Sequence, residues 1–225
     1  MRRTNLFFIP AFCILLQVCS IGCKRSGDAY SGPINNFKRY PYERFHLTYE
    51  YSGDVRGIEE LFASEFGKYE ARHSKIELFS TKGLHPSDNG SISRISDMYK
   101  VDYLLNSAVH THINQMDSIF HLESGDIPSP QAYLESEMKK NYFVKKGIDS
   151  IFGKLADRWE ESEGKMTLWI WNGLLLRRHA NSSEGYLDMK IKEVDTLWSV
   201  DTSKFSIPSG FTVSESKNEH APDTN

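Results

Sequence analysis

Residues 167–179 read "TLWIWNGLLLRRH", and this stretch decides the class of fold. Two apolar runs flank Asn172-Gly173, a dipeptide that favours the tight turn joining two antiparallel strands. The stretch therefore predicts a β-hairpin, and the rest of the chain can be compared with it.

The first strand of this hairpin is apolar on both faces. Because side chains alternate along a strand, Trp169 and Trp171 share one face while Leu168 and Ile170 share the other. A sheet with one wet side would carry polar residues on one face. Either the strand is covered on both sides, with the tryptophans packed under a helix, or one face lines an apolar cavity. Trp169 and Trp171 are therefore candidate ligand-contacting residues.

Alternation with a period of two recurs on both sides of the hairpin. In "RFHLTYEYSGD", residues 44–54, large apolar side chains alternate with polar ones until the turn residues. Runs at 55–64 and 68–80, joined across Phe66-Gly67, continue the pattern of an antiparallel meander, and residues 98–122 predict two more strands. Residues 186–194, "YLDMKIKEV", alternate again. Strands therefore dominate the prediction.

One helix is predicted, from about residue 130 to 146. Ser129 can cap it, Pro130 suits its first position, and Leu134, Met138 and Tyr142 recur at four-residue spacing. We expect these three side chains to face the sheet. Leu134 and Met138 join the candidate ligand-contacting residues.

Basic residues and a glycine mark where this helix should end. Lys139, Lys140, Lys145 and Lys146 suit the negative end of a helix dipole, and Gly147 can terminate the helix. The expected fold class is mainly β with one or two helices (α+β): a curved antiparallel sheet, an unclosed half-barrel, with a helix on its concave face.

All three cysteines of the chain lie within its first 23 residues. Arg2-Arg3 precede an apolar core at 6–18, which is typical of a signal peptide. Gly22 then precedes Cys23, and the segment resembles the lipobox of bacterial lipoproteins, in which the signal is cut before a lipid-carrying cysteine. Ser20 stands where lipoboxes usually have leucine.

Two alternatives to lipidation at Cys23 remain. Cys19 follows a leucine at the lipobox spacing, but the bulky Val18 precedes it directly, so Cys23 is favoured. A plain secretory signal with incidental cysteines is the other alternative. No Asp follows Cys23, which by the sorting of similar lipoproteins implies the outer membrane, facing the periplasm or the exterior.

These features divide the chain into four parts. We expect a signal peptide at 1–22, a polar tether at 23–40, a single folded domain at 41–213 and a disordered tail at 214–225. If processing removes Cys13 and Cys19, the mature domain has no cysteine for a disulfide, a thiolate metal site or nucleophilic catalysis.

A family resemblance rests on three segments. These are "TYEYSGDVRGIEELFASEFGKYEARHS" (48–74), "GKLADRWEES" (153–162) with "MTLWIWNGLLLRR" (166–178), and "DTSKFSIPSGFTV" (201–213). The chain resembles a group of uncharacterised bacterial envelope lipoproteins whose domain is similar to the lipoprotein carriers LolA and LolB. The resemblance implies a curved, unclosed antiparallel sheet with helices across its concave face.

His110 and His112 are the candidate metal ligands. Two residues apart on a strand, they point to the same side, and His121 could join them from the next strand. No third ligand is fixed by spacing, so two solvated histidines are the simpler interpretation. We found no phosphate-loop, dinucleotide, nucleophile-elbow or zinc-protease motif.

Charge limits the classes of function further. The formal net charge is -3 and no basic stripe occurs, so nucleic acid is not an expected partner. Acidic pairs such as Glu59-Glu60 and Glu160-Glu161 place their carboxylates on opposite strand faces and are interpreted as solubilising charges.

The sequence thus predicts a lipid-anchored, non-enzymatic envelope protein. It would need no cofactor and would bind a hydrophobic ligand, a lipid or an acyl chain, on a concave apolar face. The alternatives are a metal-dependent sensor or enzyme using His110 and His112, and an envelope scaffold without a small ligand. Protein partners are not predicted.

Overall fold

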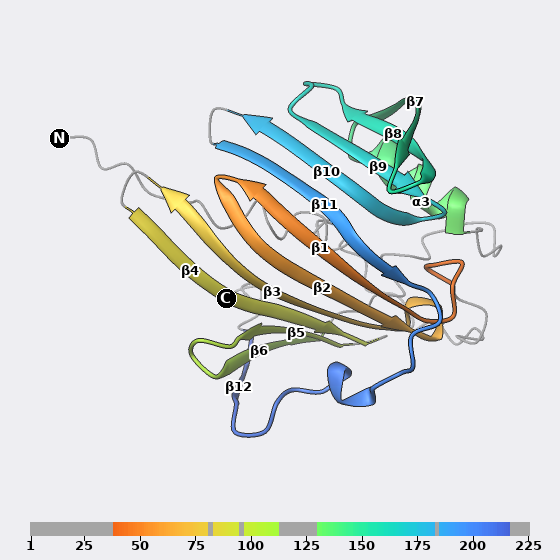
Figure 1. The fold of residues 1–225 in the computed structure, drawn as a ribbon. Helices are drawn as coiled ribbons and strands as arrows, with labels where there is room; N and C mark the ends of the chain where they lie inside the picture. The colour runs from red at the N-terminus through yellow and green to blue at the C-terminus, as the bar shows by residue number, and fades with distance from the viewer. Residues whose placement is uncertain (1–37, 81–82, 95–96, 113–129, 183–184, 217–225) are drawn as a thin grey trace, which may run out of the picture.

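The computed structural model describes residues 38–80, 83–94, 97–112, 130–182 and 185–216. These residues form one twelve-stranded sheet and one α-helix (Figure 1). The strands are β1 (Phe45–Gly53), β2 (Val55–Ser64), β3 (Tyr69–Ser80), β4 (Gly83–Ser93), β5 (Asp97–Asp102), β6 (Ser107–His112), β7 (Phe143–Ile151), β8 (Lys154–Glu161), β9 (Met166–Trp171), β10 (Leu174–Ser182), β11 (Gly185–Asp195) and β12 (Thr212–Glu215). The helix α3 is Pro130–Lys140, and two short 3₁₀ turns are η3 (Glu65–Gly67) and η4 (Thr202–Phe205).

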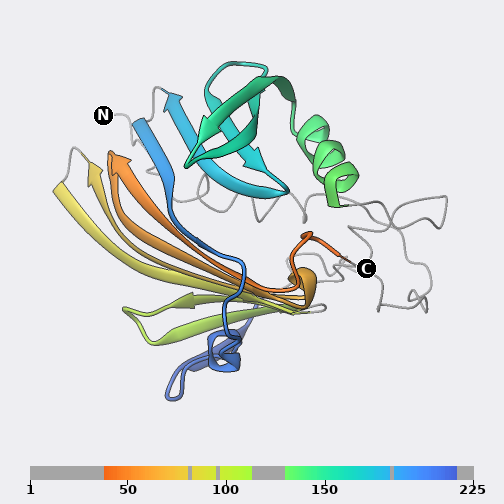
Figure 2. The ribbon, with the colours of Figure 1, turned by 45° about the vertical axis from the view of Figure 1, so that its right-hand side comes forward.

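The sheet is open and strongly curved. Its strand order is β12-β6-β5-β4-β3-β2-β1-β11-β10-β9-β8-β7, so β12 and β7 are its two edges and do not pair with each other. Figure 2 shows the long central strands bending as they cross the sheet. The expected class, mainly β with an unclosed sheet, is confirmed for the described residues. One detail differs: β12 pairs with β6 in parallel, whereas every other described pair is antiparallel.

Tight turns connect the strands as the sequence indicates. Asn172 and Gly173 both have positive φ, as a type I′ turn requires, and they join β9 to β10. At the turn from β1 to β2, a Cβ on Gly53 would lie 2.4 Å from the ring of Tyr186, so only glycine fits there. The predicted hairpin at 167–179 is confirmed.

The helix is shorter than the sequence predicts. It ends at Lys140, and Tyr142 has a φ of 62°, the left-handed conformation that the sequence assigned to Gly147. Phe143 is buried and begins β7, which places Lys145 and Lys146 in a strand. Burial of Phe143 at a strand edge outweighs the helical spacing that continued to residue 146.

Only part of the expected helix face contacts the sheet. Leu134 and Met138 pack with Phe143, Trp159 and Leu168, but Tyr142 is 75% exposed. The expectation for Tyr142 was therefore wrong, because the residue lies beyond the helix. The helix packs on the part of the sheet formed by β7 to β9 (Figure 2). Its position over the concave face as a whole stays a prediction.

The main core lies on one face of the central strands, called the core face below. It is defined by Phe45, Leu47, Tyr49 and Tyr51 of β1, which are all buried. Their register partners on β2 and β11 extend the same face. A second cluster surrounds Phe62 and Phe205, and η4 contributes to it.

At both ends of the described chain, residues contact the sheet. Tyr40 is buried against the ring of Phe45, with 4.9 Å between the ring centroids. Near the C-terminal end of the described residues, β12 extends to Glu215 and pairs with β6. Among the described residues, no helix has the length and apolar character needed to cross a bilayer.

Candidate functional site: a buried charge cluster on the core face

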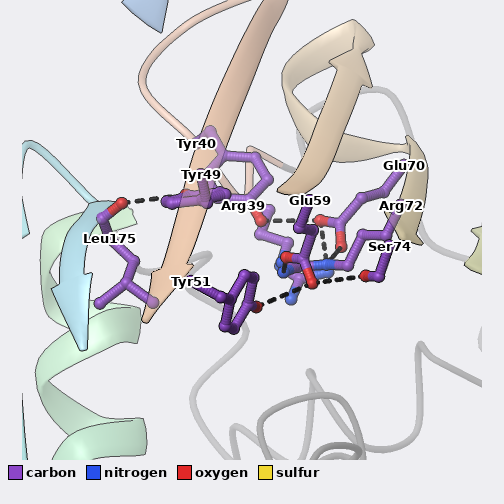
Figure 3. Close-up of polar contacts among 9 residues, drawn as sticks. All are labelled: Arg39, Tyr40, Tyr49, Tyr51, Glu59, Glu70, Arg72, Ser74 and Leu175. Carbon is purple, nitrogen blue, oxygen red and sulfur yellow. Dashed lines mark hydrogen bonds and ion pairs between the residues drawn. The ribbon is translucent and has the colours of Figure 1, made fainter. Parts of the chain in front are cut away.

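Two glutamates are buried on the core face, Glu59 of β2 and Glu70 of β3, at 4% and 2% exposure. Figure 3 shows them together with Arg72, which lies between them. Buried carboxylates are rare unless they are paired, because water no longer solvates the charge. This charge cluster is the most unusual chemical feature of the described residues. Its members are Arg39, Tyr40, Tyr51, Glu59, Glu70, Arg72 and Ser74.

Strand register brings these side chains together. Glu59 is opposite Ser74, and the next two core-face positions of β3 are Arg72 and Glu70, which are opposite Leu61 and Ala63. Because alternate residues of a strand share a face, the polar side chains of β3 lie in one row. This row meets the aromatic row of β1 across β2.

A turn positions the remaining donors of the cluster. The carbonyl oxygen of Phe66 in η3 accepts hydrogen bonds from the backbone N–H groups of Arg39 and Tyr40, at 2.9 and 3.2 Å. A Cβ on Gly67 would lie 2.7 Å from the ring of Tyr40, so the close approach depends on glycine. The segment before β1 is thereby held above Glu70.

Glu70 is fully paired. Its Oε2 accepts a hydrogen bond from the Tyr40 hydroxyl at 2.7 Å and lies 3.3 Å from Nη1 of Arg39, and its Oε1 accepts from Nε of Arg72 at 3.1 Å. Burial acts to raise the pKa of Glu70, but the two guanidinium groups and the hydrogen bonds outweigh it and lower the pKa to about 2. Glu70 therefore stays ionised at any physiological pH.

Glu59 is paired in a similar way from the other side of Arg72. Its Oε2 accepts from the hydroxyls of Tyr51 at 3.0 Å and Ser74 at 2.8 Å, and its Oε1 accepts from Nη1 of Arg72 at 3.2 Å. Although burial acts to lower the pKa of Arg72, the two carboxylates raise it well above its ordinary value. Arg72 thus joins the two halves of the cluster with a permanent charge.

The tyrosines act as hydrogen-bond donors. Burial raises the pKa of Tyr40, Tyr49 and Tyr51 above the ordinary value of 10.0, with the nearby carboxylates acting in the same direction. The Tyr49 hydroxyl donates to the carbonyl oxygen of Leu175 at 2.9 Å, which joins β1 to β10 (Figure 3). A group that cannot change its protonation near neutral pH is poorly suited to general acid or base catalysis. The cluster is suited to holding fixed charges in a buried place.

The candidate tryptophans lie in a packed cluster. Trp169 is buried, and Trp171 is half-buried against the main core. The indole Nε1 of Trp169 donates to Asp149 at 2.7 Å, and the guanidinium of Arg177 lies 4.7 Å from its ring centre. The ring of Trp171 lies near Tyr42 and Lys154.

Both faces of β9 are covered by protein. Leu168 and Ile170 pack with the helix residues Leu134 and Met138, whereas Trp169 and Trp171 pack with the main core. The structure therefore does not bring the four candidate ligand-contacting residues into one group. Two-sided packing also accounts for the apolar character of the strand, and the tryptophans do not pack under the helix.

His110 and His112 do lie on the same side of β6, and both reach Asp97. Oδ1 of Asp97 is 2.9 Å from Nε2 of His110 and 3.4 Å from Nδ1 of His112, and Glu215 contacts Nδ1 of His110 at 2.8 Å. Hydrogen bonds to Glu215 and Asp97 raise the pKa of His110. Both ring nitrogens of His110 are thus engaged by carboxylates.

No set of three His, Cys, Asp or Glu side chains with metal-site geometry occurs in the part of the chain that the structure describes. His112 is 72% exposed, and His121 lies outside the described residues. Cys13, Cys19 and the proposed lipid-bearing Cys23 lie outside them as well.

Sequence analysis missed the buried charge cluster. Glu59 was interpreted as a solubilising charge, which is wrong, although Glu60 does face the other side and contacts His46. A signal was present in β3: Glu70, Arg72 and Ser74 share their strand face with Ile76 and Leu78. Polar residues that alternate onto the same strand face as the buried apolar residues indicate a buried polar network.

Comparison with known proteins gives limited similarity. No family model matches the chain, and no curated protein matches it. Among solved structures, it is similar to an uncharacterized conserved protein from Thermus thermophilus, with a TM-score of 0.49 and 12% identity over 78% of this chain and 92% of that one.

Two more distant structures are LprF from Mycobacterium bovis and a DUF1329 family protein from Desulfovibrio piger. LprF has a TM-score of 0.33 at 10% identity, covering 77% of this chain and 91% of that one. The DUF1329 protein has a TM-score of 0.32 at 8% identity, covering 75% and 91%. Likeness at this level does not establish a shared function.

Proposed function

We propose that this chain is a lipid-anchored protein of the bacterial cell envelope that binds a hydrophobic ligand on the concave, apolar face of its sheet and catalyses no reaction. The observation that carries the proposal is the core face itself. It is rich in aromatic and aliphatic side chains, belongs to an open sheet, and also holds fixed charges.

Support for an apolar ligand comes from the continuity of this face. The row on β1 continues through Leu61 on β2 and through Met189 and Ile191 on β11, and all of these residues are buried. Protein atoms cover the row, so a ligand would enter by displacing them. Binding should therefore be coupled to a local opening, as expected for a sheet whose edges are not closed on each other.

The N-terminal sequence supports the proposed location in the cell envelope. The proposal assigns Cys23 as the lipid-bearing residue and the outer membrane as the location. Mass spectrometry of the mature N-terminus tests it: we expect a chain that begins at Cys23 with a lipid on its sulfur. An unmodified Cys23, or a chain that begins after it, would contradict the anchor.

Native mass spectrometry of the protein isolated from cells tests the ligand. A co-purified lipid or acyl chain is the expected result. Stoichiometric zinc would instead favour the metal-dependent alternative at His110 and His112, for which the shared contact to Asp97 is the favouring observation. Neither ligand nor metal, in repeated preparations, would favour an envelope scaffold.

A further inference from the structure

Arg178 of β10 is buried without a matching partner among the described residues. It is 8% exposed, and its Nε forms no hydrogen bond with any group in the part of the chain that the structure describes. Burial lowers the pKa of its guanidinium, although Tyr51 and Glu59 act in the opposite direction. A buried guanidinium normally pairs with a carboxylate or phosphate, because removing the charge from water is otherwise unfavourable.

The neighbouring arginine shows what a satisfied partner looks like. Arg177 faces the other side of β10, where its Nε and Nη2 donate to the two oxygens of Asp188 at 2.9 and 3.1 Å. This is the two-pronged pairing that the planar guanidinium favours. Two consecutive arginines of one strand thus differ: one has its anion and the other has none within the described ranges.

Arg178 shares the core face with the charge cluster. It is opposite Met189 on β11, and Met189 is opposite Tyr51 on β1, so the three residues form one row across adjacent strands. On β9 the row continues to Leu168, on the side that packs with the helix. Tyr51 in turn donates to Glu59.

Among the described residues no ion pair joins Arg178 to the buried carboxylates, although the charge of Glu59 acts on its guanidinium. Both oxygens of Glu59 already accept hydrogen bonds from Tyr51, Ser74 and Arg72, and Glu70 is bonded by Tyr40 and Arg72. Within the part of the chain that the structure describes, this position therefore has an unpaired positive charge beside an apolar row.

We propose that Arg178 binds the anionic head group of a single-chain amphiphile whose tail lies along the core face. The head is a carboxylate, as in a fatty acid, or a phosphate, as in a phosphorylated amphiphile, since both present oxygens that match the guanidinium fork. This inference rests on the proposed function, and it narrows the ligand from any hydrophobic molecule to an anionic one.

The test is titration calorimetry of the full chain with three amphiphiles of equal tail length: dodecanoate, dodecyl phosphate and dodecyltrimethylammonium. We expect the anionic probes to bind about 10-fold more tightly than the cationic one, or better. Arg178→Gln should remove this preference but keep binding of the cationic probe. Arg177→Gln, on the opposite face of the same strand, is the matched control and should keep the preference. The tighter of the two anionic probes identifies the source of the head group.

The outcomes separate this inference from the proposed function. If all three probes bind equally, and Arg178→Gln changes nothing, the inference is overturned while the proposed function stands. If no probe binds, both are overturned. Should Arg178→Gln fail to fold, Arg178→Lys keeps the charge without the fork and is expected to bind anionic probes with intermediate affinity.

Thermal unfolding provides a readout that a structural arginine would not give. In protein stripped of ligand, Arg178→Met should raise the melting temperature by about 2–4 °C, because an apolar side chain replaces a buried charge that has no ion-pair partner. A lower melting temperature would show that Arg178 serves the fold and would overturn its assignment to a ligand.

Discussion

Two of the clusters of cations and carboxylates on the described part of the sheet differ in depth and in chemistry. The cluster on β2 and β3 is buried and built on Arg72, whereas the cluster at the β5–β6–β12 edge is centred on His110, with the exposed Glu215 as one partner. Arginine keeps its charge at any physiological pH, while histidine gains or loses its charge near neutrality. The buried cluster should therefore contribute strongly to the stability of the fold, and this contribution should not change with pH near neutrality. The contribution of the edge cluster should be small and should change with pH.

The largest expected effect is the loss of Arg72. Arg72→Met would leave Glu59 and Glu70 buried without the cation that joins them, which should lower the free energy of unfolding by about 3–5 kcal/mol. Urea denaturation measures the change. Glu60→Gln, on the opposite face of β2, changes a partly exposed contact with His46 and should cost no more than about 1 kcal/mol. Equal effects of the two changes would show that burial of the Arg72 contacts adds nothing to stability beyond an ordinary surface contact.

Acid should destabilise the buried cluster through Glu70. Its pKa is lowered from the ordinary 4.5 to about 2, so its contribution to stability is fully present above pH 4.5 and is lost as the pH falls towards 2. That contribution is about 3 kcal/mol. Urea unfolding at a series of pH values should show this loss in the native protein and a smaller one in Glu70→Gln. An identical acid response of the two proteins would contradict the assignment.

A smaller loss of stability is expected when a single tyrosine hydroxyl is removed, and its size should depend on whether the acceptor is charged or neutral. Tyr51→Phe removes a donor to the Glu59 carboxylate and should cost about 1.5–3 kcal/mol. Tyr49→Phe removes a donor to the neutral carbonyl of Leu175 and should cost about 0.5–1.5 kcal/mol. Both rings stay in place, so chemical denaturation compares the two bonds directly. A larger loss of stability for Tyr49→Phe than for Tyr51→Phe would mean that the buried charge of Glu59 is not stabilised by the Tyr51 hydroxyl.

The smallest effect concerns the edge cluster. Glu215 and Asp97 raise the pKa of His110 above the ordinary 6.5, so the stabilisation of β12 is fully present below pH 6.5 and is lost as the pH rises through the pKa of His110 in the folded protein. NMR titration of the imidazole protons measures that pKa. Glu215→Gln should move it back towards 6.5, and an unchanged value would show that the contact does not form in solution.

The sequence predicted the regular strands well. Alternation identified β1, β2, β3 and β11, and Asn172-Gly173 located the β9–β10 turn, because in these segments a period of two coincides with one buried face. It did not predict β4, where the polar segment "GLHPSDNGSIS" contains Pro86. It also did not predict β7, where a bulge between Lys145 and Gly147 interrupts the alternation.

The charge cluster could not be assembled from the sequence, because its members meet only through register. Glu59 and Arg72 belong to adjacent strands, and Arg39 and Tyr40 join them through η3. Spacing did identify the histidine pair on β6, but not the partner that the two histidines share, since Asp97 lies across the ladder on β5. The local sequence pattern thus predicted the strands and the faces of their side chains. The charged contacts between strands depend on tertiary packing and could not be predicted in this way.

The central claim is that an amphiphilic ligand lies on the core face. Photo-crosslinking of the full chain with a fatty acid that carries a diazirine in its tail tests it most directly, with labelled peptides located by mass spectrometry. The account predicts saturable labelling of peptides from β1, β10 and β11, the strands that carry Tyr51, Arg178 and Met189. Labelling confined to exposed apolar residues of the β7–β8 hairpin, such as Phe152 and Leu155, or labelling that does not saturate, would contradict it.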